Sequence, residues 1–240
     1  MAASISRSTV PAPASGVQTQ STLTALTMRP VAIAVVVVAA LIMLAGVATA
    51  SSQADPVSPS VFCVRFATNV NGSSVIAVNV TRAYAPLGAD RLYALVQGDF
   101  FDSNGKEAAF FRVVPGFVVQ FGISGDPAAN AKWDNAIPDD PVVASNIAGT
   151  ISFATAGPNT RTTQLFINYV DNSFLDQSGF APLGVVTRGM DVAKMIFNPT
   201  PGDSNGVDQD QYTENGQAWI EQNYPNINSI TGANVTTGSC

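Results

Sequence analysis

The chain has 240 residues and no histidine, so it is long enough for one domain behind an N-terminal leader and lacks several kinds of catalytic chemistry. Ser–His–Asp and Cys–His catalysis and histidine-bearing zinc sites are excluded. Cys63 and Cys240 are the only cysteines, which excludes four-thiolate sites and iron–sulfur clusters. All 17 acidic residues and nine of the 11 basic ones follow position 54, which gives that part a net charge of about −8 and argues against nucleic-acid binding.

The N-terminal region contains an uncharged apolar run, VAIAVVVVAALIMLAGVATA, at residues 31–50. The run is long enough for a secretory signal or for a membrane span, and its small-x-small end predicts cleavage after Ala50. Arg7 and Arg29 are the only charged residues before position 55, and both precede the run. The positive-inside rule therefore leaves residues 51–240 on the far side of a membrane, whether the run is cleaved or retained.

These features predict a polar cytoplasmic or targeting leader (1–28), a signal peptide or membrane anchor (29–50) and a linker of turn-forming residues (51–60). We expect the protein in the lumen of the secretory pathway, either membrane-anchored or secreted, with membrane contact only through residues 31–50 if they are not cleaved. The alternative is the thylakoid lumen of a plastid, because the Ser/Thr-rich, acid-free leader resembles a transit peptide.

Two kinds of covalent modification would suit the secretory route. Sequons at Asn71, Asn79 and Asn234 are candidate glycosylation sites. Cys63 and Cys240 either pair as a disulfide in an oxidising compartment or remain free thiols.

From residue 61 onward, short β-type runs separated by turn residues predict a mainly β domain. The runs are VFCVRFAT (61–68), SVIAVNVT (74–81), AAFFRVV (108–114), GFVVQFGI (116–123), GTISFAT (149–155) and QLFINYV (164–170). Helical spacing of apolar residues interrupts them within 85–101 and 188–197, and a further short helix is expected within 214–224.

The stretch FFRVVPGFVVQFG (110–122) carries polar residues inside apolar runs. The turn-forming pair Pro115–Gly116 separates the two runs, and Arg112 and Gln120 lie within them. These two side chains either point outward from a half-exposed hairpin or line a groove whose apolar walls need a few polar groups.

A second informative stretch is GTISFATAGPNTRTTQLFINYV (149–170). Its strand-like ends enclose a loop of Gly, Pro, Asn, Thr and Arg residues. Gln164 and Phe166, two positions apart after the loop, are expected to share one face of a strand. The loop would then turn the chain so that both side chains face one groove.

Together with APLGADRLYALV and FLDQSGFAPLGVVTRGMDVAKMI, these stretches resemble the cyclophilin-type peptidyl-prolyl cis-trans isomerases, especially a bacterial-like branch with a Gly-Phe-Ala-Pro turn. The resemblance covers residues 61–197, which we take as the isomerase domain, with 198–240 as a C-terminal extension. It implies a closed antiparallel β-barrel of about eight strands capped by two α-helices. It also implies proline-containing polypeptides as partners and no cofactor or metal. We expect a monomer.

Carried over residue by residue, the resemblance makes Arg112 the catalytic arginine. The expected substrate-binding residues are Phe117, Val118, Gln120, Ala154, Thr155, Ala156, Gln164, Phe166, Phe174, Leu175 and Phe180. Three of these depart from the family pattern. Phe174 stands where many members have tryptophan, and this difference predicts weak cyclosporin binding. Phe180 replaces a pocket histidine, and Thr155 replaces an asparagine.

The predicted function is therefore cis–trans isomerisation of X–Pro bonds, in support of protein folding outside the cytosol. Rotation about this bond has a barrier of about 18–20 kcal/mol and breaks no covalent bond, so the lack of histidine removes nothing that the reaction needs. An apolar pocket would favour the twisted amide, and Arg112 could donate to it. The alternative is a catalytically weak peptide-binding or scaffold module with the same fold.

Overall fold

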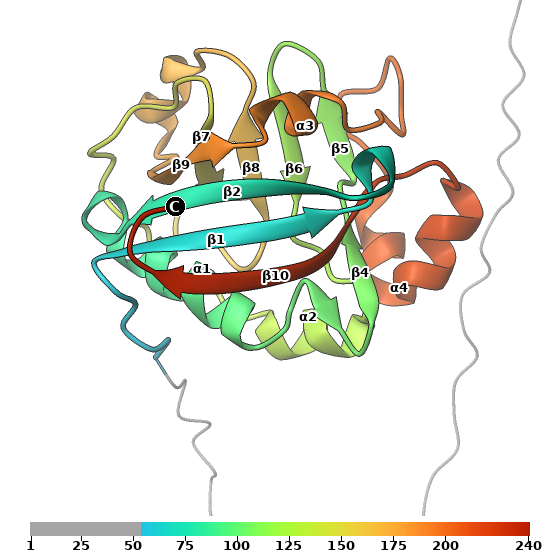
Figure 1. The fold of residues 1–240 in the computed structure, drawn as a ribbon, viewed down its shortest axis with the longest axis horizontal. Helices are drawn as coiled ribbons and strands as arrows, with labels where there is room; N and C mark the ends of the chain where they lie inside the picture. The colour runs from blue at the N-terminus through green and yellow to red at the C-terminus, as the bar shows by residue number, and fades with distance from the viewer. Residues whose placement is uncertain (1–53) are drawn as a thin grey trace, which may run out of the picture. The chain divides into compact units, whose positions relative to one another are not determined.

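The structure, a computed structural model, describes residues 54–240. The predictions made for residues 1–53, including the leader and the apolar run, lie outside the described residues. The centre of the fold is a long hairpin of β1 (Val61–Thr68) and β2 (Ser74–Thr81), which have the bounds predicted from their alternating apolar residues (Figure 1). Phe62, Val64 and Phe66 of β1 point into the core and are fully or almost fully buried.

Within residues 54–240, eight further strands and four α-helices complete the fold. The strands are β3 (Asp102–Ser103), β4 (Lys106–Ala109), β5 (Arg112–Val114), β6 (Val118–Phe121), β7 (Thr150–Phe153), β8 (Leu165–Asn168), β9 (Pro182–Arg188) and β10 (Ser229–Thr237). The α-helices are α1 (Pro86–Gln97), α2 (Pro127–Trp133), α3 (Met190–Lys194) and α4 (Gln209–Asn223). The same part of the chain contains three 3₁₀ helices: η1 (Val70–Gly72), η2 (Arg82–Tyr84) and η3 (Ser173–Ser178).

The ten strands of the described residues belong to one antiparallel sheet in the order β3-β4-β10-β1-β2-β9-β7-β8-β6-β5. The predicted mainly β, antiparallel architecture is confirmed. The prediction of a closed barrel of about eight strands with two helices needs correction. Within residues 54–240 the strand pairings give an open half-barrel with edges at β3 and β5, and four α-helices accompany it.

The difference in strand number has local causes. The predicted run 108–114 is split into β4 and β5 because Phe110 donates its backbone N–H to Asn228 and Phe111 accepts from Val207, both outside the run. Strand β9 begins with a proline, and β10 is rich in Thr, Gly and Asn, so neither has the apolar alternation typical of a strand.

The core is filled by aromatic rings and by one face of α1. Phe66, Phe101 and Phe121 meet edge to face or tilted, with ring centroids 5.2–6.1 Å apart. Leu92 and Leu95 of α1 are completely buried against the sheet. The proline that begins α1 needs no hydrogen-bond partner for its nitrogen, and this position is favourable for it.

Residues beyond 197 take part in the same folded unit as residues 61–197. Strand β10 lies between β4 and β1, and Tyr212 of α4 is fully buried, with its hydroxyl 2.9 Å from the backbone nitrogen of Ala109. The final residue, Cys240, forms a disulfide with Cys63 of β1. Among residues 54–240, no helix has the length and apolar character needed to cross a bilayer.

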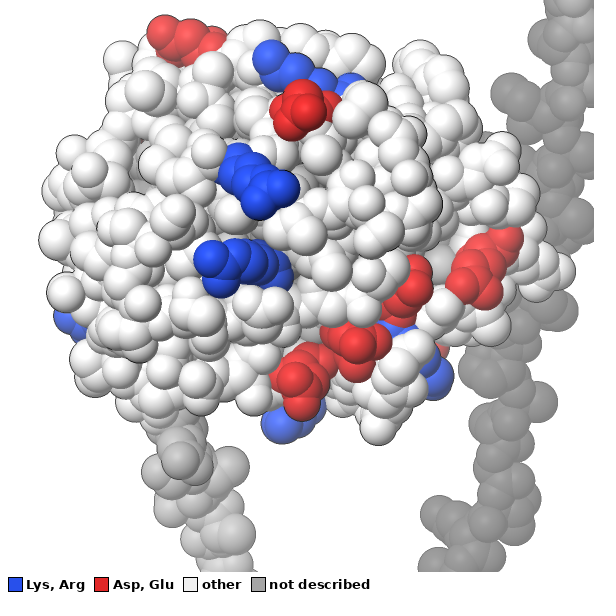
Figure 2. All heavy atoms as spheres, in the orientation of Figure 1, with Lys and Arg blue, Asp and Glu red and all other residues white. Residues whose placement is uncertain are grey.

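The face shown in Figure 2 is largely uncharged. A few basic side chains lie separately over the central strands, and acidic side chains gather toward α2 and α4. This face has no continuous basic patch of the kind that binds nucleic acid.

Candidate functional site

The β5–β6 hairpin brings Arg112 and Gln120 together. Its turn is closed by a hydrogen bond from Phe117 N to Val114 O of 3.0 Å, and Gly116 supplies the positive φ of +74° that this turn needs. The register pairs Arg112 with Gln120 directly, so both side chains are on the same face of the hairpin. Of the two arrangements left open by the sequence, the groove-lining one fits, since Gln120 is only 8% exposed.

A line of hydrogen bonds runs from the arginine along the face of the sheet. Arg112 Nη1 donates to Gln120 Oε1 at 3.1 Å, and Gln120 Nε2 donates to Gln164 Oε1 at 2.8 Å. Because arginine can only donate, it fixes the orientation of the Gln120 amide, which in turn fixes that of Gln164. The Gln164 amide nitrogen is left as the donor at the far end of the line.

Beside this line lies a cavity of about 270 Å³ with mostly apolar walls. Its lining residues are Arg112, Phe117, Val118, Gln120, Ala154, Thr155, Phe166, Leu175 and Phe180, and each was a predicted site residue. Phe166 and Phe180 meet edge to face with ring centroids 5.6 Å apart. Val118, Phe166 and Leu175 form a small buried cluster that is separate from the main core.

Three of the predicted residues lie outside this cavity lining. Phe174 is 63% exposed and stacks on Phe117, with ring centroids 6.1 Å apart and planes 16° apart. Ala156 and Gln164 line a neighbouring cavity of about 400 Å³, which shares Gln120, Ala154 and Thr155 with the first. The two cavities are thus parts of one groove.

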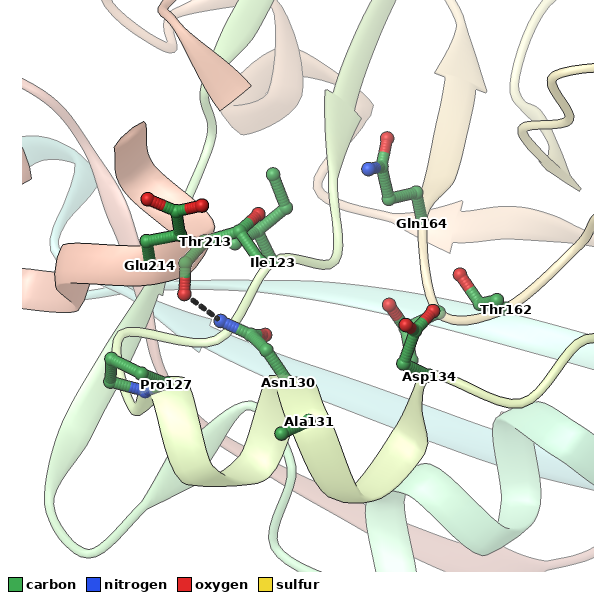
Figure 3. A pocket seen from close by; sticks show the side chains of 10 residues that line it. Ile123, Pro127, Asn130, Ala131, Asp134, Thr162, Gln164, Thr213 and Glu214 are labelled. Carbon is green, nitrogen blue, oxygen red and sulfur yellow. Dashed lines mark hydrogen bonds between the residues drawn. The ribbon is translucent and has the colours of Figure 1, made fainter. Parts of the chain in front are cut away.

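The groove continues toward α2 and α4. A third cavity, of about 430 Å³, shares Gln164, Asp134 and Thr162 with the second. In Figure 3, Gln164 and Asp134 lie at one side of it, and Asn130 of α2 faces Thr213 of α4 at the other. Asn130 Nδ2 donates to the Thr213 carbonyl at 3.3 Å, which ties the two helices together at this end.

The loop between β7 and β8 is held by a buried arginine. Arg161 is 3% exposed and donates to Asp140 Oδ2 at 3.1 Å and to the Pro138 carbonyl. The hydroxyls of Thr155 and Thr160 close the loop tip, 2.8 Å apart. Ala154 N donates to the Gln164 carbonyl at 2.9 Å, so the loop returns the chain with Gln164 beside the strand it left.

Within residues 54–240, no acidic neighbour neutralises the charge of Arg112. Its partners among residues 54–240 are carbonyl and amide oxygens, and it makes no ion pair there. Its Cζ lies 5.9 Å from the centroid of the Phe117 ring. Burial lowers the pKa of the guanidinium from its usual value, since no carboxylate opposes this effect. The cation therefore stands at the cavity with donor capacity left over.

A polar network stands behind the apolar cavity. Asn146 is completely buried and donates to the carbonyl of Phe180 and to Asp176, both at 2.8 Å. Burial by itself would raise the pKa of Asp176, but hydrogen bonds from Ser145 and Asn146 outweigh it, and the pKa is lowered. The network thereby fixes the backbone that carries Leu175 and Phe180.

Sequence reasoning missed the part of the site contributed by residues 198–209. The carbonyl of Ser204 accepts from Arg112 Nε at 2.6 Å, Gly206 packs on Arg112, and Gln209 lines the second cavity. A backbone carbonyl carries no residue-type signal, and this segment has no periodicity. Nothing in the local sequence could have placed it at the arginine.

The candidate modification sites lie in different surroundings. Asn71 and Asn234 are exposed, whereas Asn79 is partly buried in β2 and its Oδ1 is enclosed without a hydrogen-bond partner in the described part of the chain.

No cluster of three or more His, Cys, Asp or Glu residues suited to a metal occurs within residues 54–240.

Comparisons with known proteins agree on one family. Residues 63–217 match the family model described as cyclophilin type peptidyl-prolyl cis-trans isomerase/CLD. The chain is 32% identical over 142 residues to a peptidyl-prolyl cis-trans isomerase of Acinetobacter baylyi, covering 56% of this chain and 72% of that protein. It is 35% identical over 125 residues to peptidyl-prolyl cis-trans isomerase A of Dickeya dadantii, covering 47% of this chain and 60% of that protein.

A solved structure shares the fold. The crystal structure of a cyclophilin type peptidyl-prolyl cis-trans isomerase from Cryptosporidium parvum superposes with a TM-score of 0.53 at 18% identity. The match covers 74% of this chain and 99% of that one. At this identity the likeness concerns the fold alone.

Proposed function

Because this chain belongs to the cyclophilin-type peptidyl-prolyl cis-trans isomerases, we propose that it catalyses rotation about X–Pro bonds of polypeptides bound in the groove described above. One observation carries the proposal. An apolar cavity of about 270 Å³ is lined by Arg112, and this cation forms no ion pair within residues 54–240. A proline ring bound in this cavity would place the amide to be rotated beside Arg112.

The apolar walls lower the barrier by removing water. A planar amide is more polar than a twisted one, so loss of solvent destabilises the planar ground state more than the transition state. Phe166, Val118 and Leu175 supply these walls and are themselves at most 8% exposed. Their buried positions keep the cavity shape fixed while the bond rotates.

Arg112 supplies the directional part of the catalysis. As the bond twists, the proline nitrogen becomes pyramidal and gains a lone pair, to which the guanidinium can donate. A hydrogen bond from a charged donor contributes about 1.5–3 kcal/mol, whereas a rate enhancement on the order of 10⁵ requires about 7 kcal/mol. Desolvation and substrate alignment by Gln120 and Gln164 must therefore contribute the larger share.

The first test is an isomerisation assay on a short X–Pro peptide with the wild-type chain and the Arg112→Ala variant. We expect turnover to fall at least tenfold in the variant, because the donor to the twisted amide is lost. The fold should survive, since Arg112 is only partly buried and contributes to no ion pair in the described residues. Thermal unfolding of both proteins checks this.

The matched variant Arg112→Lys keeps the charge but has one nitrogen in place of three, so we expect intermediate turnover. Equal turnover in wild type and Arg112→Ala would remove the arginine from the mechanism. A folded wild type without activity would instead indicate a peptide-binding or scaffold module.

We also propose that the protein assists folding of clients outside the cytosol, in the secretory lumen or, alternatively, in the thylakoid lumen. The Cys63–Cys240 disulfide supports an oxidising compartment, as does the apolar run before residue 51. Exposed sequons at Asn71 and Asn234 are compatible with glycosylation, whereas the position of Asn79 within β2 is a poor one. Protease protection of residues 51–240 in isolated membranes would test the topology.

Two finer properties are part of the proposal. Weak cyclosporin binding is supported by Phe174, which replaces the larger ring found in many relatives and is already stacked on Phe117. A monomer remains our expectation for the quaternary state. Tight binding of cyclosporin in titration calorimetry would contradict the first property. A dimer detected by light scattering of the purified chain would contradict the second.

A further inference from the structure

The loop that follows α3 is bonded directly to the proposed catalytic arginine. The Ser204 carbonyl accepts from Arg112 Nε at 2.6 Å. Next to it, Val207 N donates to the carbonyl of Phe111 at 3.0 Å. Residues 204 and 207 thus hold residues 111 and 112 from one side, in addition to the β5–β6 pairing on the other.

Gly206 permits this close approach. It has φ +83°, and a Cβ placed on it would lie 2.7 Å from Arg112 Cβ and 2.7 Å from the Phe111 carbonyl oxygen. Real Cβ atoms do not approach other atoms so closely, so any side chain at this position would push the loop away from the arginine.

The loop also has hydrogen bonds of its own, which do not involve Arg112. Asp203 N donates to the Thr200 carbonyl at 3.0 Å. Asp203 Oδ1 accepts from both the backbone and the side-chain nitrogen of Asn205, at 2.8 and 2.9 Å. The Ser204 carbonyl lies between these two residues and is held in place by them.

The result is an arginine whose guanidinium is fixed at two edges. Nε is used by the Ser204 carbonyl and one Nη1 hydrogen by Gln120, so the remaining Nη hydrogens are left for the substrate. A free arginine side chain loses much rotamer freedom when it is ordered, and a side chain ordered before the reaction avoids that loss in the transition state.

We propose that the 198–207 loop, through the Ser204 carbonyl and the close packing of Gly206, positions Arg112 for donation to the twisted X–Pro amide. The inference rests on the proposed function. Ser204 and Gly206 are positioning residues, because they contact Arg112 and neither of them lines the cavities that would hold the substrate. A segment outside the predicted isomerase domain thereby becomes part of the catalytic apparatus.

The test compares Gly206→Ala with Gly202→Ala in the full chain. Gly202 has a similar φ of +88°, but a Cβ there would meet nothing within 4 Å, so this control carries the same backbone strain without the clash. We expect Gly206→Ala to lower kcat about five- to tenfold with KM within about twofold of wild type. Hydrogen exchange of the Arg112 Nε–H, followed by NMR, should accelerate, whereas Gly202→Ala should match wild type in both measurements.

A milder pair of variants covers the case in which Gly206→Ala does not fold. Both variants remove the negative charge of Asp203. Asp203→Ala also removes the oxygen that accepts from Asn205, whereas Asp203→Asn keeps an Oδ1 acceptor. We expect Asp203→Ala to lower kcat about threefold with faster Nε–H exchange, and Asp203→Asn to restore most of the loss. A purely structural role would not give this rescue at equal unfolding temperature.

Two results would overturn the proposal while leaving the proposed function intact. One is Nε–H exchange that stays at the wild-type rate in Gly206→Ala and in Asp203→Ala. The other is accelerated exchange with unchanged kcat, provided that Arg112→Ala loses turnover in the same assay. An inactive wild type, or an Arg112→Ala variant of full activity, would overturn both proposals together.

Discussion

At the scale of single residues, Asp176 shows how a charge outside the groove maintains the shape of the pocket. Its carboxylate accepts from Ser145 Oγ at 2.5 Å and from Asn146 N and Nδ2 at 2.9 and 2.8 Å. These bonds connect η3, which contributes Leu175 to the pocket, to the segment before β7. All of the partners are donors, so the ionised form of Asp176 is the one that the site favours.

We expect Asp176→Asn to be less stable than wild type at neutral pH by on the order of 1 kcal/mol, because hydrogen bonds to a charged acceptor become bonds to a neutral one. The pKa of Asp176 is lowered in the folded state. Its contribution is therefore complete above the unfolded pKa of about 3.9 and is lost as pH falls through the folded pKa. Urea unfolding at pH 7 and pH 3 should show the gap between the proteins narrowing at the lower pH.

The comparison variant is Asp210→Asn, since Asp210 is exposed and makes no ion pair or hydrogen bond through its side chain in the described residues. Its stability relative to wild type should change little with pH. A gap between wild type and Asp176→Asn that stays constant from pH 7 to pH 3 would contradict the role given to the ionised carboxylate.

At the scale of secondary-structure elements, the stretch predicted as a linker is attached to α1. Asp55 pairs with Arg91 at 2.7 Å, and Ser58 donates twice to Asp90 of the same helix. Arg91 is 2% exposed, and its Nη1 also donates to the carbonyls of Asn135 and Thr162, at 2.8 and 3.0 Å. Because Thr162 lines the groove, one buried arginine links the start of the folded unit to the groove wall.

We expect Asp55→Ala to lower the free energy of unfolding by about 3–5 kcal/mol, because it leaves the Arg91 cation buried without its counter-charge. The loss should be measured by urea unfolding. The exposed Asp210→Ala serves as the control and should cost less than about 1 kcal/mol. A loss for Asp55→Ala no larger than that of the control would show that Arg91 is satisfied by its carbonyl partners alone.

Prediction from the sequence succeeded where an element carries its own signal. Alternating apolar residues located β1 and β2, and helical spacing located α1, because each buries one face in a regular way. Helix α2 was missed because it has seven residues. The start of α4 was missed because the residues before its kink at Gly216 are polar except for the buried Tyr212. Strand β10 is defined by its neighbours β1 and β4, which no local pattern of Thr, Gly and Asn reveals.

The candidate site divides in the same way. Nine predicted residues line the small apolar cavity, and their side-chain types made them recognisable through the family resemblance. The contacts that hold Arg112 from the 198–207 loop come from a carbonyl and from a missing Cβ. Such contacts depend on tertiary approach and leave little trace in residue type.

At the scale of the whole molecule, covalent and hydrogen bonds attach the C-terminal residues to β1. Cys240 is joined to Cys63 of β1 across 177 positions, and Gly238 N donates to the Val61 carbonyl at 3.1 Å. The other end of β10 is held separately, where Ser229 and Ile230 pair with β4. The disulfide therefore limits fraying of the C-terminal end of β10 and restricts the unfolded chain. The pairing of β10 with β4 has its own hydrogen bonds and does not depend on the disulfide.

We expect Cys240→Ser to lower the free energy of unfolding by about 2–5 kcal/mol, since a disulfide that closes a long loop restricts the unfolded state. The substitution is made at Cys240, which is exposed. Cys63 is completely buried, and a serine in its place would have a buried hydroxyl without a hydrogen-bond partner. Isomerase turnover well below the melting temperature should stay within about twofold of wild type, because the β4–β10 pairing is retained. Urea unfolding with and without reductant measures the first effect, and the peptide assay measures the second.

Reductant should destabilise the wild type to the level of the variant and leave the Cys63→Ser/Cys240→Ser double variant unaffected. Two alkylatable thiols in the untreated wild type, or equal unfolding with and without reductant, would contradict the cross-link. The same alkylation, carried out on the protein in its own cells, would show whether the disulfide forms there and therefore whether the compartment is oxidising. Blocked thiols there would mean that the C-terminal strand is locked in an oxidising compartment, whereas free thiols would place the folded unit in a reducing one and remove a main support for the lumenal assignment.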